Sequence, residues 1–317
     1  MKILHKLLDI HKINGAYPAI GLTIGNFDGV HLGHRELLKK IKRDCKSKNL
    51  LFVVVTFIPH PQKILHPEKE HFLINSYEHR RNLLKSLGVD VLVEMGFTRD
   101  FSTLSPECFL LDQLLIYPEL RDFYLGYDFA FGANKQGDFD LVKDLCRPLQ
   151  IEVQIQPKFE FNEKVVSSSL IRDKVVTGKV DEVEELLARP FHLEGVVIKG
   201  EGRGKQIGFP TANIQVSSDL IVPQTGVYVT RTNRSGMTYN SITNIGKNPT
   251  FKDTNQIHVE THLFDFDIDI YGESLDIEFL LKLRDEKKFP TVNDLIAQIK
   301  TDIIKAKEFL NNNNPLN

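Results

Sequence analysis

The sequence predicts an α/β domain, built on a parallel sheet with crossover helices, followed by an antiparallel six-stranded β-barrel with a terminal helix. Three observations lead to this prediction. The chain has 317 residues, which is long for a single hydrophobic core, so two domains are expected. Short apolar runs alternate with helical patterns in the first half. The second half instead contains short β-rich runs separated by turn residues.

The first half contains apolar runs that predict strands and amphipathic stretches that predict helices. Apolar strands separated by helices indicate a parallel sheet, because the intervening helices serve as crossover connections. Ligands of such sheets bind beyond the carboxyl ends of the strands. The expected strands are 19–26, 50–57, 89–94, 122–125 and 151–156, and the expected helices are 33–46, 76–86 and 105–116.

The pattern changes near Arg189 and Pro190. Short β-rich runs separated by Gly, Asn, Asp and Pro follow this point, which favours a compact antiparallel barrel or sandwich. We therefore expect one domain over residues 1–188 and a second over residues 189–317. Helices are expected at 168–176 and 180–188, strands at 192–199, 211–216, 226–232, 238–243, 258–264 and 274–283, and a closing helix at 291–310.

Composition and charge favour a cytoplasmic protein that acts on small molecules. The chain carries 40 basic and 42 acidic side chains, a net charge of −2, which gives no global attraction to nucleic acid or to an anionic membrane. No apolar stretch approaches the roughly 18 residues of a membrane span, and the N-terminus lacks a signal-peptide run. Cys45, Cys108 and Cys146 lack CxxC spacing, so reduced thiols are expected. The oligomeric state stays open.

Residues 25–34 (GNFDGVHLGH) follow the first strong predicted strand and open a helix. Glycines let the backbone approach an anionic ligand, and a helix N-terminus offers unpaired N–H groups. His31 and His34 lie near one helical face, so both rings can reach one phosphate group and donate hydrogen bonds to charge that develops on phosphorus. The alternative is a turn with a metal-binding or merely packed histidine pair.

This segment resembles the signature of the HxGH nucleotidyltransferase superfamily, in the form found in bacterial FAD synthetases. The resemblance implies a Rossmann-like domain in which a phosphate of the second substrate attacks the α-phosphorus of ATP and pyrophosphate leaves. It extends to residues 56–61 (TFIPHP), 126–132 (GYDFAFG), 136–138 (QGD) and 166–172 (VSSSLIR). It implies nucleotide binding by Gly25, Asn26, Phe27, Asp28, Gly33, Ser167, Ser168 and Ser169, catalysis by His31, His34 and Arg172, and flavin binding by Pro61, Asp128 and Phe131.

The serines of the last segment can donate to phosphate oxygens, and Arg172 supplies a fixed fork of donors for pyrophosphate. The same pattern also fits an N-cap followed by a solvent-facing arginine. Members of the family commonly have an arginine where this chain has Ala130, and Ala133 and Asn134 lie in a loop with fewer basic residues than usual. These departures concern the flavin end of the site and leave the two histidines in place.

Residues 200–213 (GEGRGKQIGFPTAN) form the most distinctive segment of the second half. The glycines suit a loop that folds over phosphates, but GxxxxGK[ST] is absent, so this is not a Walker loop. A glycine-rich loop by itself is also typical of a flexible hairpin. The FPTAN run and the loop before it resemble the riboflavin kinase motif, which implies that Gly202, Arg203, Lys205, Thr211 and Asn213 bind ATP and that Thr211 and Asn213 bind Mg²⁺. Hydroxyl and amide oxygens are suitable ligands for Mg²⁺.

Further matches to the kinase family follow in order at 226–228, 244–251, 259–262 and 283–289. The resemblance identifies Glu260 as the catalytic base, although a glutamate in a β-like run equally fits a solvent-facing strand residue. It also implies that Arg284 and Phe289 contact the flavin. His258 and His262 share the face of Glu260 in an extended strand, and we interpret them as supporting or packing residues.

The resemblance covers nearly the whole chain and implies a bifunctional enzyme, with ATP, riboflavin and FMN as its small-molecule partners. Such an enzyme phosphorylates riboflavin to FMN, then adenylylates FMN to FAD. The primary hydroxyl of riboflavin needs a base. The phosphate of FMN, with a second pKa of about 6, is already mostly dianionic, so its attack needs positioning and charge stabilisation. The alternatives are a riboflavin kinase with an impaired or altered first domain, and a non-catalytic flavin- or nucleotide-binding protein.

Overall fold

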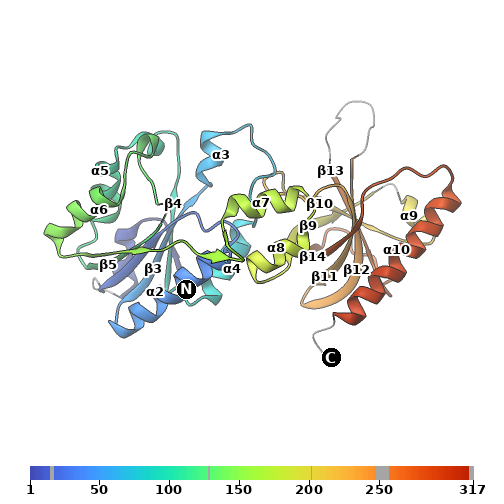
Figure 1. The fold of residues 1–317 in the computed structure, drawn as a ribbon, viewed down its shortest axis with the longest axis horizontal. Coiled ribbons are helices and arrows are strands. Elements are labelled where there is room, and N and C mark those ends of the chain that lie inside the picture. The colour runs from blue at the N-terminus through green and yellow to red at the C-terminus, as the bar shows by residue number, and fades with distance from the viewer. Residues whose placement is uncertain (15–17, 128, 201, 248–256, 314–317) are drawn as a thin grey trace. The chain divides into compact units, whose positions relative to one another are not determined.

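The structure is a computed structural model that describes residues 1–14, 18–127, 129–200, 202–247 and 257–313. The chain divides into two compact units, which are described separately (Figure 1). The first unit comprises Met1–Lys69 and Tyr77–Ser167, and the second comprises Glu70–Ser76 and Ser168–Asn317. This division by contacts does not test where each catalytic domain ends, so the limits 1–188 and 189–317 stay a prediction.

The first unit is built on the predicted parallel sheet. Six strands among the described residues pair in the order β1-β4-β3-β2-β5-β6, and all of these pairings are parallel. The five predicted strands are confirmed, and β1 is an additional edge strand that the interrupted apolar pattern of the N-terminus concealed. The strands are β1 (Lys2–Leu4), β2 (Ile20–Ile24), β3 (Leu51–Ile58), β4 (Val91–Gly96), β5 (Leu120–Gly126) and β6 (Glu152–Gln156).

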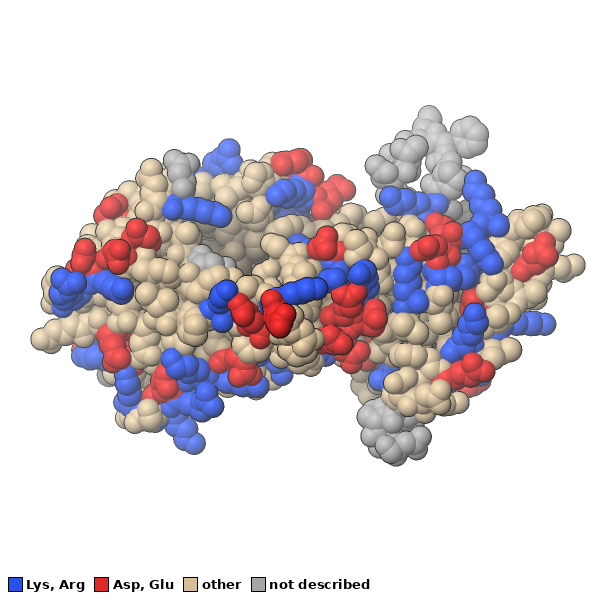
Figure 2. All heavy atoms as spheres, viewed as in Figure 1, with Lys and Arg blue, Asp and Glu red and all other residues tan. Residues whose placement is uncertain are grey.

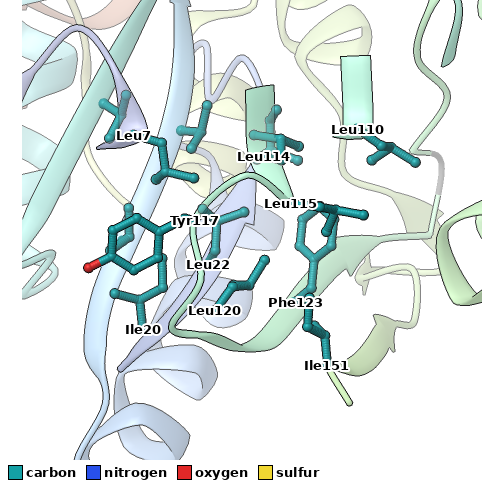
Figure 3. Close-up of a cluster of buried hydrophobic side chains, with 14 of the residues drawn as sticks. Leu7, Ile20, Leu22, Leu110, Leu114, Leu115, Tyr117, Leu120, Phe123 and Ile151 are labelled. Atoms are coloured by element: carbon teal, nitrogen blue, oxygen red, sulfur yellow. The ribbon is translucent and has the colours of Figure 1, made fainter. Parts of the chain in front are cut away.

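A hydrophobic core cluster lies on each face of this sheet. Successive strand residues point to opposite faces, so one strand contributes side chains to both clusters. On β3, Val53 and Val55 belong to one core cluster (Figure 3), and Phe52 and Val54 belong to the other. The predicted helix 105–116 is an α-helical turn that continues as a π-helix. The helices are η1 (Leu7–Ile10), α1 (His11–Asn14), α2 (Leu32–Ser47), α3 (Pro61–Leu65), α4 (Tyr77–Ser86), η2 (Phe101–Thr103), α5 (Pro106–Phe109), η3 (Leu110–Leu114), η4 (Ala133–Lys135), α6 (Phe139–Cys146) and η5 (Arg147–Leu149), and a hairpin of β7 (Glu160–Phe161) and β8 (Lys164–Val165) follows β6.

The segment Glu70–Ser76 belongs to the second unit, although the chain before and after it belongs to the first. The backbone N–H groups of His71 and Phe72 donate to the carbonyls of Ser218 and Asp219 at 2.7 and 2.8 Å. Helices α7 (Ser168–Val176) and α8 (Val180–Leu187) are part of the same unit. Backbone pairing between segments so far apart in the chain leaves no periodic signal in the sequence.

The second unit contains a closed antiparallel barrel, which confirms the predicted fold. Its strands, over the part of the chain that the structure describes, pair in the order β10-β13-β12-β11-β14-β9. The short helix α9 (Arg203–Gln206) precedes β10, and α10 (Val292–Asn312) follows the barrel. The strands are β9 (Phe191–Ile198), β10 (Ala212–Val216), β11 (Gly226–Arg234), β12 (Met237–Lys247), β13 (Ile257–Leu263) and β14 (Ser274–Arg284).

Helix α10 packs Ala306 and Leu310 against Val227 and Val229 of β11.

The opposite side of the barrel wall is partly polar. Buried Thr and Ser hydroxyls of β11, β12 and β13 form hydrogen bonds to one another there. Basic and acidic side chains are interspersed over the face shown in Figure 2.

Helix α10 begins at a capping box: the Thr291 hydroxyl accepts from the N–H of Asp294 at 3.1 Å, and the Asp294 carboxylate accepts from the N–H of Thr291 at 3.2 Å. We expect Thr291→Ala to lower the free energy of unfolding by about 1 kcal/mol, because the helix loses its N-cap. Thr301→Ala is the matched control, since Thr301 lies within the helix and donates to the carbonyl of Ala297. Urea denaturation of the two variants should differ, and equal losses would contradict this account.

Candidate active sites

The first candidate site lies where the strand order of the parallel sheet reverses. The chain continues from β2 to β3 and β4 on one side, whereas β5 and β6 lie on the other side. At such a point the carboxyl ends of neighbouring strands leave room for a ligand. Strands β2, β3 and β5 are followed by residues 25–34, 59–61 and 127–132 respectively. The topology therefore brings three of the segments singled out in the sequence to one edge of the sheet.

The turn between β2 and α2 is held by buried apolar side chains. Phe27 and Val30 have φ of 48° and 41° and are buried in the core cluster that α2 covers. Positive φ is strained for a non-glycine residue and persists where surrounding packing fixes it, often at functional sites. Gly29 adopts φ of 84° at no such cost. Asp28 is also buried, so the turn is packed into the folded core.

His31 caps helix α2. Its Nδ1 accepts the backbone N–H of His34 at 3.3 Å, so in the neutral ring the proton lies on Nε2. The His31 and His34 rings stack with centroids 3.7 Å apart. A Cβ at Gly33 would lie 3.3 Å from the His31 ring, so glycine leaves room for this packing. The structure thus brings the two predicted histidines together, with an Nε2–H donor on His31.

His34 is neutral at physiological pH. Burial, and to a smaller extent the nearby His31, lower the pKa of His34 well below its usual 6.5. Its Nδ1 is buried and has no hydrogen-bond partner among the described residues, and Phe27 contacts the ring edge-on at 5.1 Å between centroids. A neutral imidazole at His34 suits hydrogen bonding to an anion better than it suits proton storage.

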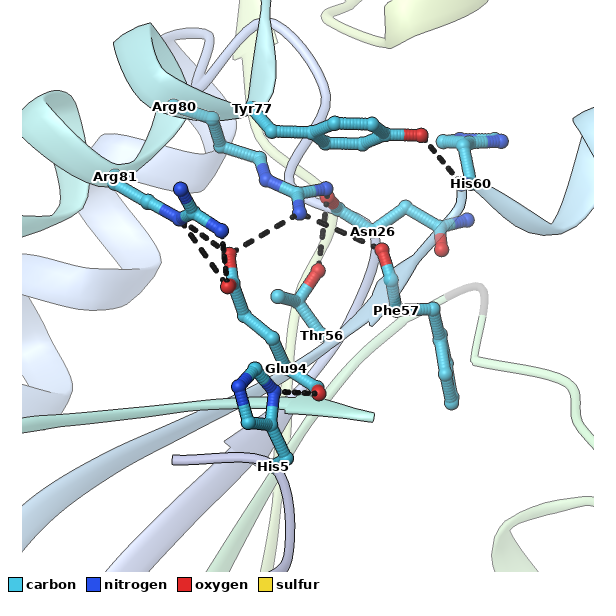
Figure 4. A network of polar contacts seen from close by, with 9 residues as sticks. All are labelled: His5, Asn26, Thr56, Phe57, His60, Tyr77, Arg80, Arg81 and Glu94. Atoms are coloured by element: carbon cyan, nitrogen blue, oxygen red, sulfur yellow. Dashed lines mark hydrogen bonds and ion pairs between the residues drawn. The ribbon is translucent and has the colours of Figure 1, made fainter. Parts of the chain in front are cut away.

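A polar network of buried side chains binds the backbone of the turn at Asn26 (Figure 4). The carbonyl of Asn26 accepts from the guanidinium of Arg80 at 2.9 Å and from the hydroxyl of Thr56 at 3.3 Å. The neighbouring Arg81 holds the buried carboxylate of Glu94 with three hydrogen bonds of 2.6 to 3.1 Å. Arg80 and Arg81 were not among the predicted site residues, because charged residues in an amphipathic helix usually face solvent.

The predicted flavin-binding residues of this unit occupy different environments. Pro61 is the first residue of α3, which His60 caps by accepting the N–H of Gln62 at 3.2 Å. Phe131 is 8% exposed and stacks on Phe129 at 4.8 Å between centroids, inside the core cluster of Figure 3. Asp128 lies outside the described residues. Flavin binding by these residues stays a prediction.

The second nucleotide segment lies at the start of α7, with Ser168 and Ser169 in its first turn and Ser167 just before it. Arg172 donates its Nε–H to the carbonyl of Phe72 at 2.9 Å, and its guanidinium carbon lies 3.8 Å from the centroid of the Phe72 ring. These contacts are within the second unit. The arginine is therefore held in place by Phe72 and does not extend freely into solvent, while its action on a nucleotide remains predicted.

The second candidate site lies on the outer wall of the barrel, across β10, β13 and β12. Glu260 is paired in register with Asn213 on one side and Asn244 on the other. Directly paired residues share one face of a sheet, and the buried Val259 and Thr261 point to the opposite side. Glu260 therefore stands between two amides on the outside of the barrel. Asn244 lay within a matched motif but was not predicted as a site residue, since the sequence does not give the register.

The glycine-rich loop packs directly on this group. A Cβ at Gly200 would lie 2.1 Å from the Asn213 side chain, and a Cβ at Gly204 would lie 3.2 Å from the Thr211 hydroxyl. Only glycine permits so close an approach. The structure therefore places the loop beside Thr211 and Asn213, and it also begins α9 at Arg203, with Lys205 in the same turn.

The remaining predicted residues of this unit are near the ends of its strands. Arg284 forms an ion pair with the buried Asp302 of α10 at 2.8 Å, and its guanidinium carbon lies 5.8 Å from the centroid of the Phe289 ring. The structure thus brings Arg284 and Phe289 together. His262 Nδ1 lies 2.7 Å from the carbonyl of Pro210, which supports a packing role. Of the matched motif 244–251, residues 248–251 lie outside the described residues.

The depressed pKa of His34 predicts a pH dependence of stability. The native state binds a proton at His34 less readily than the unfolded chain does. The free energy of unfolding is therefore highest above pH 6.5 and falls as the pH drops below 6.5, by up to about 1.4 kcal/mol per pH unit. We expect His34→Gln to flatten the decline in urea stability between pH 7.5 and 5.5. Parallel curves for the two proteins would show that His34 does not titrate in this way.

Comparison with known proteins accounts for both units. Residues 16–170 match the family model described as FAD synthetase, and residues 187–310 match that of riboflavin kinase. The chain is 35% identical to a bifunctional riboflavin kinase/FMN adenylyltransferase of Bacillus subtilis, over 98% of this chain and 99% of that protein. The corresponding protein of Listeria monocytogenes is 36% identical, over 91% of each chain.

A solved structure is also similar: the macrolide-efflux protein of Streptococcus pneumoniae is 32% identical, with a TM-score of 0.81 over 92% of this chain and 94% of that one.

Within the described ranges, no helix is both long enough and apolar enough to cross a membrane. The match to the sequence relatives extends through both units in the same order. This chain belongs to the bifunctional riboflavin kinase/FMN adenylyltransferase family, also called FAD synthetases.

Proposed function

We propose that the two reactions of this family occur at two separate sites, one at the β2–α2 turn and one on the barrel wall. The chain is a riboflavin kinase and an FMN adenylyltransferase, and it completes FAD synthesis from riboflavin. The observation that supports the division is the difference between the sites. The barrel presents a carboxylate, Glu260, between two amides. The β2–α2 turn presents two stacked histidines, one of them neutral by its depressed pKa.

In the barrel, Glu260 acts as the base for phosphorylation of riboflavin. A primary hydroxyl is a weak nucleophile, and a carboxylate within hydrogen-bond reach can accept its proton as the bond to phosphorus forms. Asn213 and Asn244 lie on either side of the carboxylate, and Arg284 and Phe289 contact the flavin. The glycine-rich loop, with Gly202, Arg203 and Lys205, folds over the ATP phosphates.

Mg²⁺ is the metal we propose for the barrel site, held by Thr211, Asn213 and the phosphates of ATP. The residues fit this ion: hydroxyl and amide oxygens are hard ligands, and Mg²⁺ usually takes few protein ligands beside substrate phosphates. The described part of the chain has no group of three or more His, Cys, Asp or Glu side chains that could hold a metal by itself. When bound, the ion neutralises charge on the transferred phosphoryl group.

At the β2–α2 turn, the phosphate of FMN attacks the α-phosphorus of ATP and pyrophosphate leaves. The attacking group is already ionised, so His31 and His34 serve as hydrogen-bond donors to the charge that develops on phosphorus. Gly25, Asn26, Phe27, Asp28 and Gly33 shape the ATP site at this turn. The assignment of Ser167, Ser168, Ser169 and Arg172 to the leaving phosphates rests on the resemblance of their motif to that of the family. Pro61, Asp128 and Phe131 contact the flavin of FMN.

We place both reactions in the cytoplasm, where ATP is available and thiols stay reduced. Cys45, Cys108 and Cys146 are all free thiols in the structure, in keeping with that compartment. The substrates are the small molecules ATP, riboflavin and FMN.

Single substitutions should separate the two activities. Glu260→Ala removes the base, so it should abolish formation of FMN from riboflavin but leave conversion of supplied FMN to FAD. His31→Ala should have the reverse effect, because the kinase site is on the barrel. Chromatography of the flavin products measures both activities in each variant. Loss of both activities in either variant, with the protein still folded, would contradict the division.

Gly200→Ala tests the contact between the glycine-rich loop and Asn213. The added Cβ would lie 2.1 Å from the Asn213 side chain, so the loop or the amide must move. We expect riboflavin phosphorylation to fall by about 10- to 100-fold, with little change in FMN adenylylation. Gly96→Ala is the control, since a Cβ there has no atom within 4 Å. Full kinase activity in Gly200→Ala would show that this contact is not required.

A further inference from the structure

Arg80 of α4 is a buried charge with no place in the chemistry described above. It is 2% exposed, and a charged group withdrawn from water is costly unless hydrogen bonds and opposite charges compensate. Its two terminal nitrogens donate to the carbonyls of Asn26 at 2.9 Å and Phe57 at 3.4 Å. These carbonyls lie at the carboxyl ends of β2 and β3. Arg80 thus joins the ends of two strands at the ligand-binding edge of the sheet.

The neighbouring Arg81 already satisfies the carboxylate of this network. Arg81 makes the bidentate contact with Glu94, with hydrogen bonds of 2.6 to 3.1 Å, whereas Arg80 approaches Glu94 only to 3.9 Å. The contacts of Arg80 in Figure 4 are mainly with backbone carbonyls. Two adjacent arginines therefore have different partners: Arg81 balances the charge of Glu94, and Arg80 holds the turn.

Holding the carbonyl of Asn26 fixes the orientation of a whole peptide group. In a planar trans peptide the C=O and the following N–H point in opposite directions. With the Asn26 carbonyl directed to Arg80, the N–H of Phe27 points away from Arg80. The same peptide leads into the strained φ of Phe27 and onward to His31, the N-cap of α2. The direction of the turn therefore depends on a contact at its base.

The electrostatic surroundings agree with such a role. Burial lowers the pKa of Arg80, and the carboxylates of Asp28 and Glu94 oppose that change, so the guanidinium stays charged. Asp28 is itself buried in the turn. A positive charge beneath the turn offsets this carboxylate, which would otherwise repel the phosphates of a bound nucleotide.

We propose that Arg80 is a positioning residue for adenylyl transfer, which sets the conformation of the β2–α2 turn by binding the carbonyl of Asn26. It acts through the turn and does not touch the nucleotide. The proposal rests on the proposed function, in that it takes adenylyl transfer to occur at this turn. It assigns to α4 a part in the reaction for which the sequence motifs give no indication.

Arg80→Met and Arg80→Lys test the proposal in the full-length protein. Methionine keeps much of the apolar stem and removes every donor, so we expect kcat/KM for ATP in FMN adenylylation to fall about 100-fold, with a raised KM for ATP. Lysine keeps the positive charge and a donor that can reach the Asn26 carbonyl, so Arg80→Lys should recover part of the lost kcat/KM for ATP. Thermal unfolding of the same preparation reports whether the first unit is folded, and riboflavin phosphorylation reports whether the barrel is folded.

Arg81→Met is the matched control, since Arg81 lies on the same helix and binds Glu94. This variant should be less stable to heat, because it leaves a buried carboxylate without its main partner, but its KM for ATP should not change. A purely structural role of Arg80 would lower the amount of active enzyme and leave KM for ATP as it is. That result, or an equal rise of KM in Arg81→Met, would overturn the proposal.

His31→Ala in the same assay distinguishes the two possible failures. If His31→Ala loses FAD formation while Arg80→Met keeps it with an unchanged KM for ATP, the positioning role is wrong and the site stands. If His31→Ala still forms FAD at the normal rate, the site itself is wrongly placed.

Discussion

The peptide that joins Asn26 to Phe27 must hold one orientation, because the turn, the cap of α2 and both histidines follow it in the chain. A buried carbonyl needs a donor, and this one has the Arg80 guanidinium and the Thr56 hydroxyl. The apolar side chains of Phe27 and Val30 fix the other side of the turn in the core. A site for a highly charged ligand is thus built from a tightly packed turn that contains the buried Asp28, and Arg80 is the one buried Lys or Arg side chain among the described residues.

The two units use different groups to bind the negatively charged phosphates of ATP. In the first, the donors at the turn come from a helix N-terminus and from imidazoles, one of which burial keeps neutral. In the second, a glycine-rich loop lies against Asn213 and Thr211, and a carboxylate stands next to them in the barrel wall. A carboxylate near a phosphate is electrostatically unfavourable, but the barrel site needs one as a base, because a hydroxyl must lose its proton there. That requirement applies to riboflavin and not to FMN.

Much of the fold followed from the sequence. The strands of the parallel sheet and of the barrel were predicted within a few residues, because apolar runs and turn residues mark them directly, and α7 was predicted with its observed limits. Strand β1 was missed because two lysines and a histidine interrupt the apolar pattern at the N-terminus. The membership of Glu70–Ser76 in the second unit could not be foreseen, since it depends on backbone hydrogen bonds to residues some 150 positions away.

The candidate sites were predictable where chemistry is concentrated in short motifs, and not where it depends on register or burial. His31 and His34 are three positions apart in one motif, and the structure stacks them. Asn244 reaches Glu260 only through the pairing of β12 with β13. Arg80 resembles any surface arginine of an amphipathic helix until its burial is known.

The central claim is that one chain converts riboflavin to FAD by two successive reactions at two different sites. The most direct measurement is incubation of the purified protein with riboflavin, ATP and Mg²⁺, with the flavin products separated by chromatography over time. The account predicts that FMN appears first and that FAD then accumulates. Accumulation of FMN alone, or the absence of any new flavin, would contradict it.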